Sequence, residues 1–263
     1  MTFILPIANQ AGSAGKTTTT IGVAGGLAKL GRNIVIADGD GQANASYHLG
    51  IEDPKYTLGD LLLGRCTLEE AIVQTKIPGL WIIPSAERQV TEVTELARQP
   101  VGAEQRMRRA FEPLIGGVDG IIIDCPGSLD IITVSAFVAA KGKKDNDAAN
   151  VVTVIAPQVK EVQGIPKIER TIEDVRNAYN PRLQLAAIIP CMIPSSQAGK
   201  MYEQVVEQAR ALYGDKVSPV LRRSVRVPEA YAYQLLIQDH APDDAITKDL
   251  NTLTDWFIEK DIV

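Results

Sequence analysis

A glycine-rich loop near the start of the chain is the segment best suited to chemistry. Residues 9–18 read Asn-Gln-Ala-Gly-Ser-Ala-Gly-Lys-Thr-Thr, between an apolar run that predicts a strand and a run that predicts a helix. Backbone amides at such a strand-to-helix turn can bind phosphate groups. The lysine supplies a cation for terminal phosphates, and the first threonine hydroxyl suits Mg²⁺. We therefore predict a nucleotide-phosphate site made by Gly12, Ser13, Ala14, Gly15, Lys16, Thr17 and Thr18.

The loop departs from the usual phosphate-loop pattern, which has a second glycine five residues before Gly15. That position is Gln10 in this chain. A chance Gly-Lys-Thr at a helix start is the plain alternative, and acidic residues that follow two other apolar runs argue against it.

Those acidic residues are Asp38 and Asp40 after one apolar run, and Asp124 after another. The carboxyl ends of parallel strands meet at one edge of a sheet, so these carboxylates should converge near the glycine-rich loop. We predict that Thr17, Asp124 and Asp38 serve a magnesium ion, and that Asp38 or Asp40 orients water toward a γ-phosphate. Taken singly, each aspartate could equally be a helix cap or a turn residue.

The elements that must position these residues are short β-branched runs that alternate with helix-length amphipathic segments. This alternation predicts an α/β fold with a single doubly wound, mostly parallel sheet flanked by helices, and no linker or repeat divides residues 1–263 into two domains. Strands are predicted at Phe3–Ala8, Asn33–Ala37, Leu80–Pro84, Gly120–Asp124, Val151–Ala156 and Leu185–Pro190. Helices are predicted at Thr17–Leu30, Thr57–Leu63, Leu68–Gln74, Ala103–Ile115, Ile131–Ala140, Ile165–Asn177, Ala198–Tyr213 and Ala245–Ile258.

Pro6 is a local misfit, because it lies inside the first predicted strand and has no amide donor for the ladder. Either that strand starts at Ile7, or a bulge or unpaired segment takes the proline.

Composition restricts the class of protein. The chain has 263 residues, a formal net charge of −5 and 45% hydrophobic residues, which is ordinary for a globular protein. No apolar run reaches the roughly 20 residues of a membrane-spanning helix. The three cysteines lie far apart without CxxC spacing, which disfavours a metal site and favours a reducing cytoplasm. Net acidity argues against a wholly basic nucleic-acid coat, but a local basic patch is compatible with it.

Three motifs resemble those of the ParA/MinD family of deviant Walker ATPases. They are the loop at 9–18, the segment Asp38-x-Asp40-x-Gln42-Ala43-Asn44-Ala45-Ser46, and Asp124-Cys125-Pro126. Residues 56–62 and 80–85 resemble the plasmid-partition branch, and Arg226-Val227-Pro228-Glu229-Ala230 resembles the family's C-terminal signature. The resemblance covers nearly the whole chain.

Membership would imply a P-loop NTPase fold, binding of ATP and Mg²⁺, an ATP-dependent sandwich homodimer, and nonspecific DNA binding by that dimer. It would also imply slow ATP hydrolysis, stimulated by a small adaptor protein that is McdB-like or ParB-like. On the matching positions, Lys16 and the loop amides would stabilise the transferring charge, Asp40 would position the attacking water, and Pro228 would contact the nucleotide.

The chain departs from the family at position 11. The family's signature lysine, which reaches the partner's phosphates across the dimer, would stand where this chain has Ala11. Three explanations are open: an inactive ATPase, a replacement lysine from elsewhere, or an introduced substitution. The intact loop and acidic motifs favour a replacement, for which Lys160, just past a predicted strand end, is the candidate. Lys160 could equally be a solvated loop residue, and weaker candidates are Lys141, Lys143 and Lys144.

A family member without the loop lysine resembles the carboxysome-positioning McdA branch. We therefore predict that the protein distributes carboxysomes on the nucleoid, with plasmid or chromosome partition by a ParA as the close alternative. Two alternatives come from other classes: an ATP-dependent small-molecule ligase or kinase on the same fold, and a nonhydrolysing nucleotide-binding scaffold.

A second cluster of charge is a candidate DNA-binding patch. Arg222, Arg223 and Arg226 stand within five residues of an otherwise acidic chain, and clustered positive charge suffices for contacts with phosphates. A solvated charged turn is the alternative. The last residues, 255–263, carry mainly acidic charge, so we expect no membrane binding. The expected location is the cytoplasm, with association to the nucleoid when ATP is bound.

Overall fold

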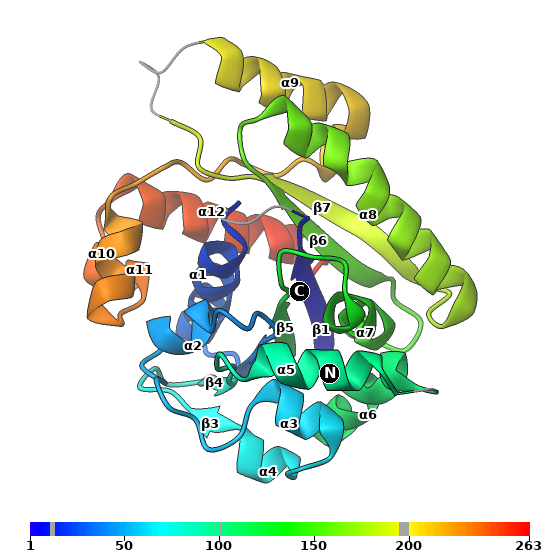
Figure 1. Cartoon of the computed structure of the whole chain (residues 1–263). Coiled ribbons are helices and arrows are strands. Elements are labelled where there is room, and N and C mark those ends of the chain that lie inside the picture. Colours follow the sequence, from blue (N-terminus) through cyan, green and yellow to red (C-terminus); the bar gives the residue numbers. More distant parts are fainter. Residues whose placement is uncertain (11–13, 100, 195–199) are drawn as a thin grey trace.

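The central sheet determines where the candidate residues lie. The computed structural model describes residues 1–10, 14–99, 101–194 and 200–263, and the strands in these ranges form one seven-stranded sheet of order β3-β4-β2-β5-β1-β6-β7 (Figure 1). Neighbouring strands pair in parallel except β3 and β4, which are antiparallel. This confirms the predicted mostly parallel sheet. The strands are β1 (Phe3–Ala8), β2 (Ile34–Asp38), β3 (Val73–Gln74), β4 (Leu80–Ile83), β5 (Gly120–Asp124), β6 (Ala149–Ile155) and β7 (Leu183–Pro190).

Helices cover both faces of the sheet, which explains why the central strands are buried along their whole length. On one face, a hydrophobic core joins the sheet to α3 (Leu58–Leu63), α6 (Arg106–Phe111), α7 (Ile131–Ala139) and α8 (Val159–Ala178). On the other face, a second core joins it to α1 (Lys16–Lys29), α10 (Arg226–Tyr233), α11 (Ile237–His240) and α12 (Ala245–Glu259). The remaining α-helices are α2 (Asn44–His48), α4 (Leu68–Ala71), α5 (Gln89–Ala97) and α9 (Lys200–Tyr213).

Small residues let α12 pack closely on α1. A Cβ atom at Gly22 would lie 2.4 Å from Leu250 Cδ2, and one at Gly26 would lie 2.7 Å from Thr254 Oγ1. The glycines reduce helix propensity in α1, and the close contact with α12 is what they permit. This packing fixes the middle and the C-terminal half of α1 against α12.

Pro6 lies inside β1 without breaking the sheet. The Ile4 amide donates to the Lys141 carbonyl, on the side away from β5, and position 6 faces the same way because backbone groups alternate along a strand. The ladder between β1 and β6 begins only at Ile7, which is paired with Val152. The unpaired segment that the sequence allowed as one option is therefore where the proline is accommodated.

Three helix predictions need correction. The helix predicted at Leu68–Gln74 ends at Ala71, and Val73–Gln74 forms the edge strand β3. The helix predicted at Ala103–Ile115 is a short α-helix between two 3-10 turns, and Pro113 lies in the second turn. α8 begins at Val159 rather than Ile165, so Pro166 lies inside the helix instead of at its start. The helices α2, α5, α10 and α11 were not predicted, because none of them carries a long apolar period.

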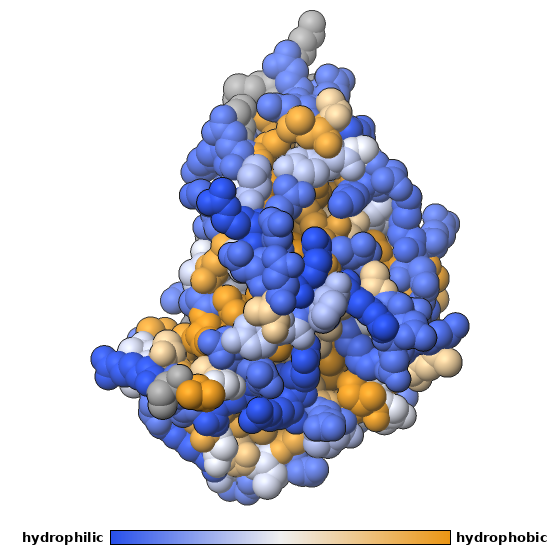
Figure 2. All heavy atoms as spheres, turned by 90° about the vertical axis from the view of Figure 1, so that its right-hand side faces the viewer, coloured by the Kyte–Doolittle hydropathy of each residue, from blue (hydrophilic) through white to orange (hydrophobic). Residues whose placement is uncertain are grey.

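The face formed by α8 and α9 is mostly hydrophilic, with hydrophobic residues in separate groups (Figure 2). The buried side of α8 carries Val162, Ile165, Ile168 and Ile172. Among the described residues, no helix combines the length and the apolar character needed to cross a membrane.

Candidate functional site

The glycine-rich loop joins β1 to α1 at the carboxyl edge of the sheet. Gly15 precedes α1 with a φ of +99°, a conformation that suits glycine. A Cβ atom here would lie 2.9 Å from the Cβ of Cys191, so the loop fits tightly against the segment that follows β7. Of the residues predicted to bind phosphate, Gly12 and Ser13 lie outside the described residues, as does Ala11.

The first turn of α1 is arranged to receive an anion. In the described part of the chain, no side chain caps this helix, and its first turn carries no acidic residue. The positive end of the helix dipole favours an anion at this helix start, and backbone amides in the first turn of a helix suit phosphate oxygens. The Lys16 side chain is buried, and its charge acts on Asp124.

Thr17 and Asp124 meet at the base of the site. The Thr17 hydroxyl donates to Asp124 Oδ2 at 2.7 Å, and the Thr20 hydroxyl donates to Asp124 Oδ1 at 3.3 Å. Asp38 is the register partner of Asp124 where β2 pairs with β5. The three oxygen-bearing side chains predicted to serve a magnesium ion are thus brought to one place.

The oxygen chemistry of this group fits Mg²⁺. In the described part of the chain, no set of three or more histidine, cysteine or acidic side chains is spaced to hold a metal ion. Mg²⁺ rarely uses such a cage, and commonly takes one or two protein oxygens together with phosphate oxygens and water. Thr17 and Asp124 could supply those protein oxygens.

Both buried carboxyl groups hold protons more tightly than usual. Burial raises the pKa of Asp38, although the amide and hydroxyl of Ser46 donate to its Oδ2 at 2.9 Å and 2.7 Å and oppose the shift. Burial also raises the pKa of Asp124, helped by the charge of Asp38 and opposed by Thr17 and Lys16. A bound cation would reverse the effect by favouring the ionised forms.

Asp40 lies between the buried Asp38 and the open cavity. It is half-buried, lines the cavity, and its Oδ1 accepts a 3.0 Å hydrogen bond from the Gln42 amide. The Asp40 amide donates to Asp38 Oδ1 at 3.2 Å. Asp40 is therefore the acidic residue exposed to a ligand, whereas Asp38 supports the loop beneath it.

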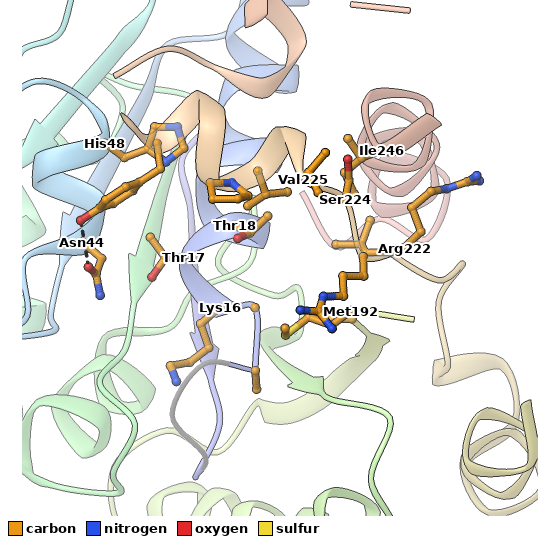
Figure 3. Close-up of a pocket in the computed structure, with 18 of the residues that line it drawn as sticks. Lys16, Thr17, Thr18, Asn44, His48, Met192, Arg222, Ser224, Val225 and Ile246 are labelled. Atoms are coloured by element: carbon orange, nitrogen blue, oxygen red, sulfur yellow. Dashed lines mark hydrogen bonds between the residues drawn. The ribbon is translucent and has the colours of Figure 1, made fainter. Parts of the chain in front are cut away.

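A cavity of about 1030 Å³ opens above the first turn of α1. Asn44 and His48 lie on one side of it and Met192 and Arg222 on the opposite side, with Thr17 between them (Figure 3). The predicted residues Ala14, Gly15, Lys16, Thr18, Asp40, Pro228 and Arg223 also line the cavity. This volume is at the upper end of the usual range for small-molecule sites.

Several residues at this cavity were missed by the sequence analysis. Tyr231 from α10 donates to Asn44 Oδ1 at 3.2 Å, and its ring stacks near Tyr47 and His48. Burial lowers the pKa of His48, whose Nε2 lies 2.7 Å from the Leu235 carbonyl oxygen. These contacts join α2 to α10, and no sequence spacing signals them because the two helices are distant in the chain.

The predicted arginine patch is partly neutralised. The Arg222 Nε lies 2.6 Å from Asp249 Oδ2, and Arg226 Nη1 lies 2.7 Å from Glu229 Oε2. Among the described residues, no carboxylate lies within ion-pair distance of Arg223, which is exposed. The structure thus brings Arg222 and Arg223 to the cavity rim and leaves Arg226 beside it on α10.

Lys160 lies in the first turn of α8, just beyond β6, and is exposed. Its neighbour Glu161 is buried and accepts a 3.2 Å hydrogen bond from the Asn9 side chain, where the glycine-rich loop begins. The weaker candidates are placed elsewhere: Lys141 bridges to Ile4 near the start of β1, and Lys143 pairs with Asp261. Lys160 is therefore the candidate lysine positioned beside the loop.

A parallel sheet with a glycine-rich loop between its first strand and first helix, and with acidic residues after two adjacent strands, defines a P-loop nucleoside triphosphatase. A family model described as an AAA domain matches residues 2–185. The chromosome partitioning protein ParA of Caulobacter vibrioides is 37% identical over 235 residues, covering 88% of this chain and 84% of that protein. The chromosome-partitioning ATPase Soj of Thermus thermophilus is 33% identical over 239 residues, covering 90% and 88%. The chain belongs to the ParA/MinD family of ATPases.

Solved structures share this fold. Cobyrinic acid a,c-diamide synthase from Mycobacterium smegmatis, solved with an ATP analogue and magnesium, has a TM-score of 0.75 and 28% identity, covering 89% of this chain and 92% of that chain. An McdA variant from Cyanothece in complex with ATP has a TM-score of 0.83 at 19% identity, covering 98% and 95%. MinD from Pyrococcus horikoshii with Mg-ADP has a TM-score of 0.79 at 22% identity, covering 97% and 95%. The last two likenesses concern the fold alone.

Proposed function

We propose that the protein is a Mg²⁺-dependent partition ATPase whose ATP-bound homodimer binds DNA nonspecifically and releases it after hydrolysis. The hydrogen bond between Thr17 and Asp124, at a helix start that no side chain of the described residues caps, carries this proposal. Relatives named for chromosome partitioning, identical at 37% and 33% of aligned positions, support the same function.

The chain's residues divide the chemical work. Mg²⁺-bound ATP supplies the phosphoryl group and part of the neutralising charge. Lys16 and the amides at the start of α1 hold the phosphates and stabilise charge that develops during transfer. Thr17 and Asp124 offer oxygen ligands, while Asp38 supports the surrounding water shell. Asp40, which faces the cavity, orients the attacking water.

A second copy of the chain completes the site in this scheme. Position 11 lacks the family's lysine, and Lys160 supplies the replacement cation across the dimer. The exposed Lys160 is in the first turn of α8, and the bond between Glu161 and Asn9 joins that turn to the glycine-rich loop.

DNA binding is assigned to the arginine patch of Arg222, Arg223 and Arg226. The ion pairs of Arg222 and Arg226 reduce their free charge, so Arg223 carries most of the attraction to phosphates. Dimerisation doubles the patch, which couples DNA affinity to the nucleotide state.

The cargo we propose is a chromosome or plasmid. The relatives at 37% and 33% identity are named for chromosome partitioning, whereas McdA shares only the fold. Distribution of carboxysomes stays a prediction. The adaptor that stimulates hydrolysis would then be ParB-like, with an McdB-like protein as its counterpart in the carboxysome alternative.

The proposal treats residues 1–263 as one ParA-like ATPase domain in the cytoplasm, associated with the nucleoid when ATP is bound and not bound to membrane. The continuous sheet supports one domain, since β1 pairs with both β5 and β6.

A small-molecule amide synthase is a second candidate. The synthase from Mycobacterium smegmatis is 28% identical, and the cavity extends from the phosphate loop to His48 and Tyr231, which leaves room for a second ligand. A ligase would need a small-molecule acceptor, and a nonhydrolysing scaffold would bind ATP without turnover.

Phosphate release from ATP, measured with Mg²⁺ in the absence and presence of DNA, separates these functions. A partition ATPase should show slow turnover that DNA and an adaptor raise. Turnover that needs only a small metabolite would identify a ligase, and binding without turnover under every condition would identify a scaffold.

A further inference from the structure

The peptide that joins Asp38 to Gly39 is held on both of its polar atoms. The Gln89 side chain donates from Nε2 to the Asp38 carbonyl oxygen at 3.2 Å. The Gly39 amide donates to the Asp124 carbonyl oxygen at 2.9 Å. Only Gly39 separates this peptide from Asp40. The orientation of the peptide therefore influences the direction of the Asp40 carboxylate.

Gln89 is itself held in place. It is fully buried, and its Oε1 accepts a 3.1 Å hydrogen bond from the Gly59 amide in the first turn of α3. One amide side chain therefore bridges the end of β2 to α3. Burial of an amide is costly unless it is hydrogen-bonded, which indicates that both contacts are specific.

Helix α5, which begins at Gln89, and helix α3 form a tight pair. The Thr57 hydroxyl donates to Glu92 Oε2 at 2.6 Å, and Arg88 lies 3.5 Å from both Asp60 and Glu92. A Cβ atom at Gly59 would lie 2.2 Å from Glu92 Oε2, so α3 approaches α5 as closely as glycine allows. These contacts fix α5 against α3 and so fix the backbone of Gln89.

The loop that follows Asp38 lies between β5 and α5. A Cβ atom at Gly39 would lie 2.9 Å from the Asp124 carbonyl oxygen, and one at Gly41 would lie 2.7 Å from Val90 Cγ2. The loop therefore has little room to move sideways. Rotation of the 38–39 peptide is restricted on one side by the hydrogen bond of the Gly39 amide to Asp124 and on the other by the Gln89 hydrogen bond to the Asp38 carbonyl oxygen.

We propose that Gln89 is a positioning residue for ATP hydrolysis, which orients the Asp38–Gly39 peptide and thereby Asp40. This inference rests on the proposed function. Loss of the Gln89 donor would leave a buried carbonyl unsatisfied, and the peptide would rotate to recover a partner. Asp40 would move away from the water, while the phosphates would stay bound to α1. The effect should therefore fall on kcat and spare nucleotide affinity.

Two variants distinguish the hydrogen bond of Gln89 with Gly59 from its hydrogen bond with Asp38. Gln89→Met keeps the size and removes both polar contacts, whereas Gln89→Glu keeps an acceptor for Gly59 and loses the donor to Asp38. Glu92→Gln, one turn further along α5, is the matched control because it keeps an acceptor for Thr57. We expect both Gln89 variants to lower kcat about tenfold to a hundredfold while the Kd of a nonhydrolysable ATP analogue stays the same. An unchanged kcat, or a control that loses as much, would overturn the proposal.

A double-mutant cycle tests whether Gln89 acts through Asp40. In an Asp40→Asn background, Gln89→Met should cause no further loss of kcat, because the group it positions has already been changed. If the kcat losses of the two single variants multiply in the double variant, Gln89 acts independently of Asp40, and the proposal is overturned. If Gln89→Met does not fold, the same cycle is run with Gln89→Glu.

If the wild-type protein hydrolyses no ATP, the proposed function fails, but the positioning role of Gln89 can still be tested. Amide hydrogen exchange provides that test. Gln89→Met or Gln89→Glu should speed exchange at Gly39, Asp40 and Gly41, whereas Glu92→Gln should leave it unchanged. Equal exchange in wild type and in the Gln89 variants would exclude any positioning role.

Discussion

The Thr17 hydroxyl donates a 2.7 Å hydrogen bond to Asp124 Oδ2, which joins the first turn of α1 to the end of β5. The two residues are 107 positions apart in the chain, and the parallel sheet alone brings them together. Their contact places a hydroxyl and a carboxylate at the base of the cavity, where a phosphate-bound magnesium ion can share both oxygens.

Removing the Thr17 hydroxyl should weaken Mg²⁺-dependent nucleotide binding. Thr17→Val keeps the shape and removes the ligand oxygen, so we expect the ATP affinity to fall at least tenfold in Mg²⁺ and to change little in EDTA. Isothermal titration with a nonhydrolysable analogue measures both. Thr17→Ser is the control, since it restores the hydroxyl. Equal loss with and without Mg²⁺ would mean that Thr17 does not serve the metal.

Stability of the ligand-free protein should fall as pH rises. Burial raises the pKa of Asp38 to about 6 and that of Asp124 to about 7. A carboxyl group with a raised folded-state pKa stabilises the fold below its ordinary pKa of about 4, and that contribution is lost as pH rises through the raised values. Melting temperatures between pH 5 and pH 8 should therefore decrease, and Asp124→Asn should flatten the decrease.

Magnesium and nucleotide should remove this pH dependence, because the bound cation favours the ionised carboxylates. An Asp124→Asn protein whose melting temperature has the same pH dependence as wild type would show that Asp124 does not contribute to it.

Lys160→Ala should abolish ATP-dependent dimerisation and leave folding intact, because the exposed side chain has no ion pair among the described residues. Sedimentation velocity with Mg²⁺ and a nonhydrolysable ATP analogue provides the measurement. Lys167→Ala, an exposed lysine further along α8, is the control. A Lys160→Ala protein that still dimerises would remove Lys160 from the site.

Arg223→Glu should weaken DNA binding more than Arg222→Glu or Arg226→Glu. Arg222 and Arg226 are already paired with Asp249 and Glu229, so less of their charge is available to phosphates. Fluorescence anisotropy in an ATP-bound state, repeated over a salt series, should show a slope reduced by about one for each DNA phosphate that the variant no longer neutralises. Equal weakening at all three positions would mean that the ion pairs open on DNA.

A methyl group added at the contact between α1 and α12 should destabilise the protein. A Cβ atom at Gly22 would lie 2.4 Å from Leu250 Cδ2, so Gly22→Ala should destabilise the protein by about 1–3 kcal/mol. Gly164→Ala in α8 meets nothing within 4 Å and should stabilise by about 0.5–1 kcal/mol through helix propensity. Urea unfolding measures both, and the same sign for the two changes would contradict the packing.

Much of the site could be predicted because strand ends determine it. Asp38 and Asp124 are the last residues of two adjacent parallel strands, β2 and β5. The strand order alone therefore places them side by side. Gln89 gave no such signal, since a glutamine in a short amphipathic stretch looks like any exposed helix residue. Its role depends on a contact with the Asp38 carbonyl across 51 positions, which only the packing of α5 creates.

The start of α8 shows a different limit. The amphipathic pattern of the sequence predicted a helix at Ile165–Asn177. The helix instead begins at Val159, which places Lys160 and Glu161 in its first turn beside Asn9. The contact between Glu161 and Asn9 joins distant parts of the chain, so local sequence periodicity carries no sign of it.

DNA retention in different nucleotide states tests the central claim most directly. Anisotropy of a labelled duplex of arbitrary sequence, titrated with the protein in Mg²⁺ and ATP or in Mg²⁺ and ADP, compares the two states. A nucleotide-switched partition ATPase predicts salt-sensitive binding with ATP and little binding with ADP. Equal binding in both states, or none in either, would contradict it.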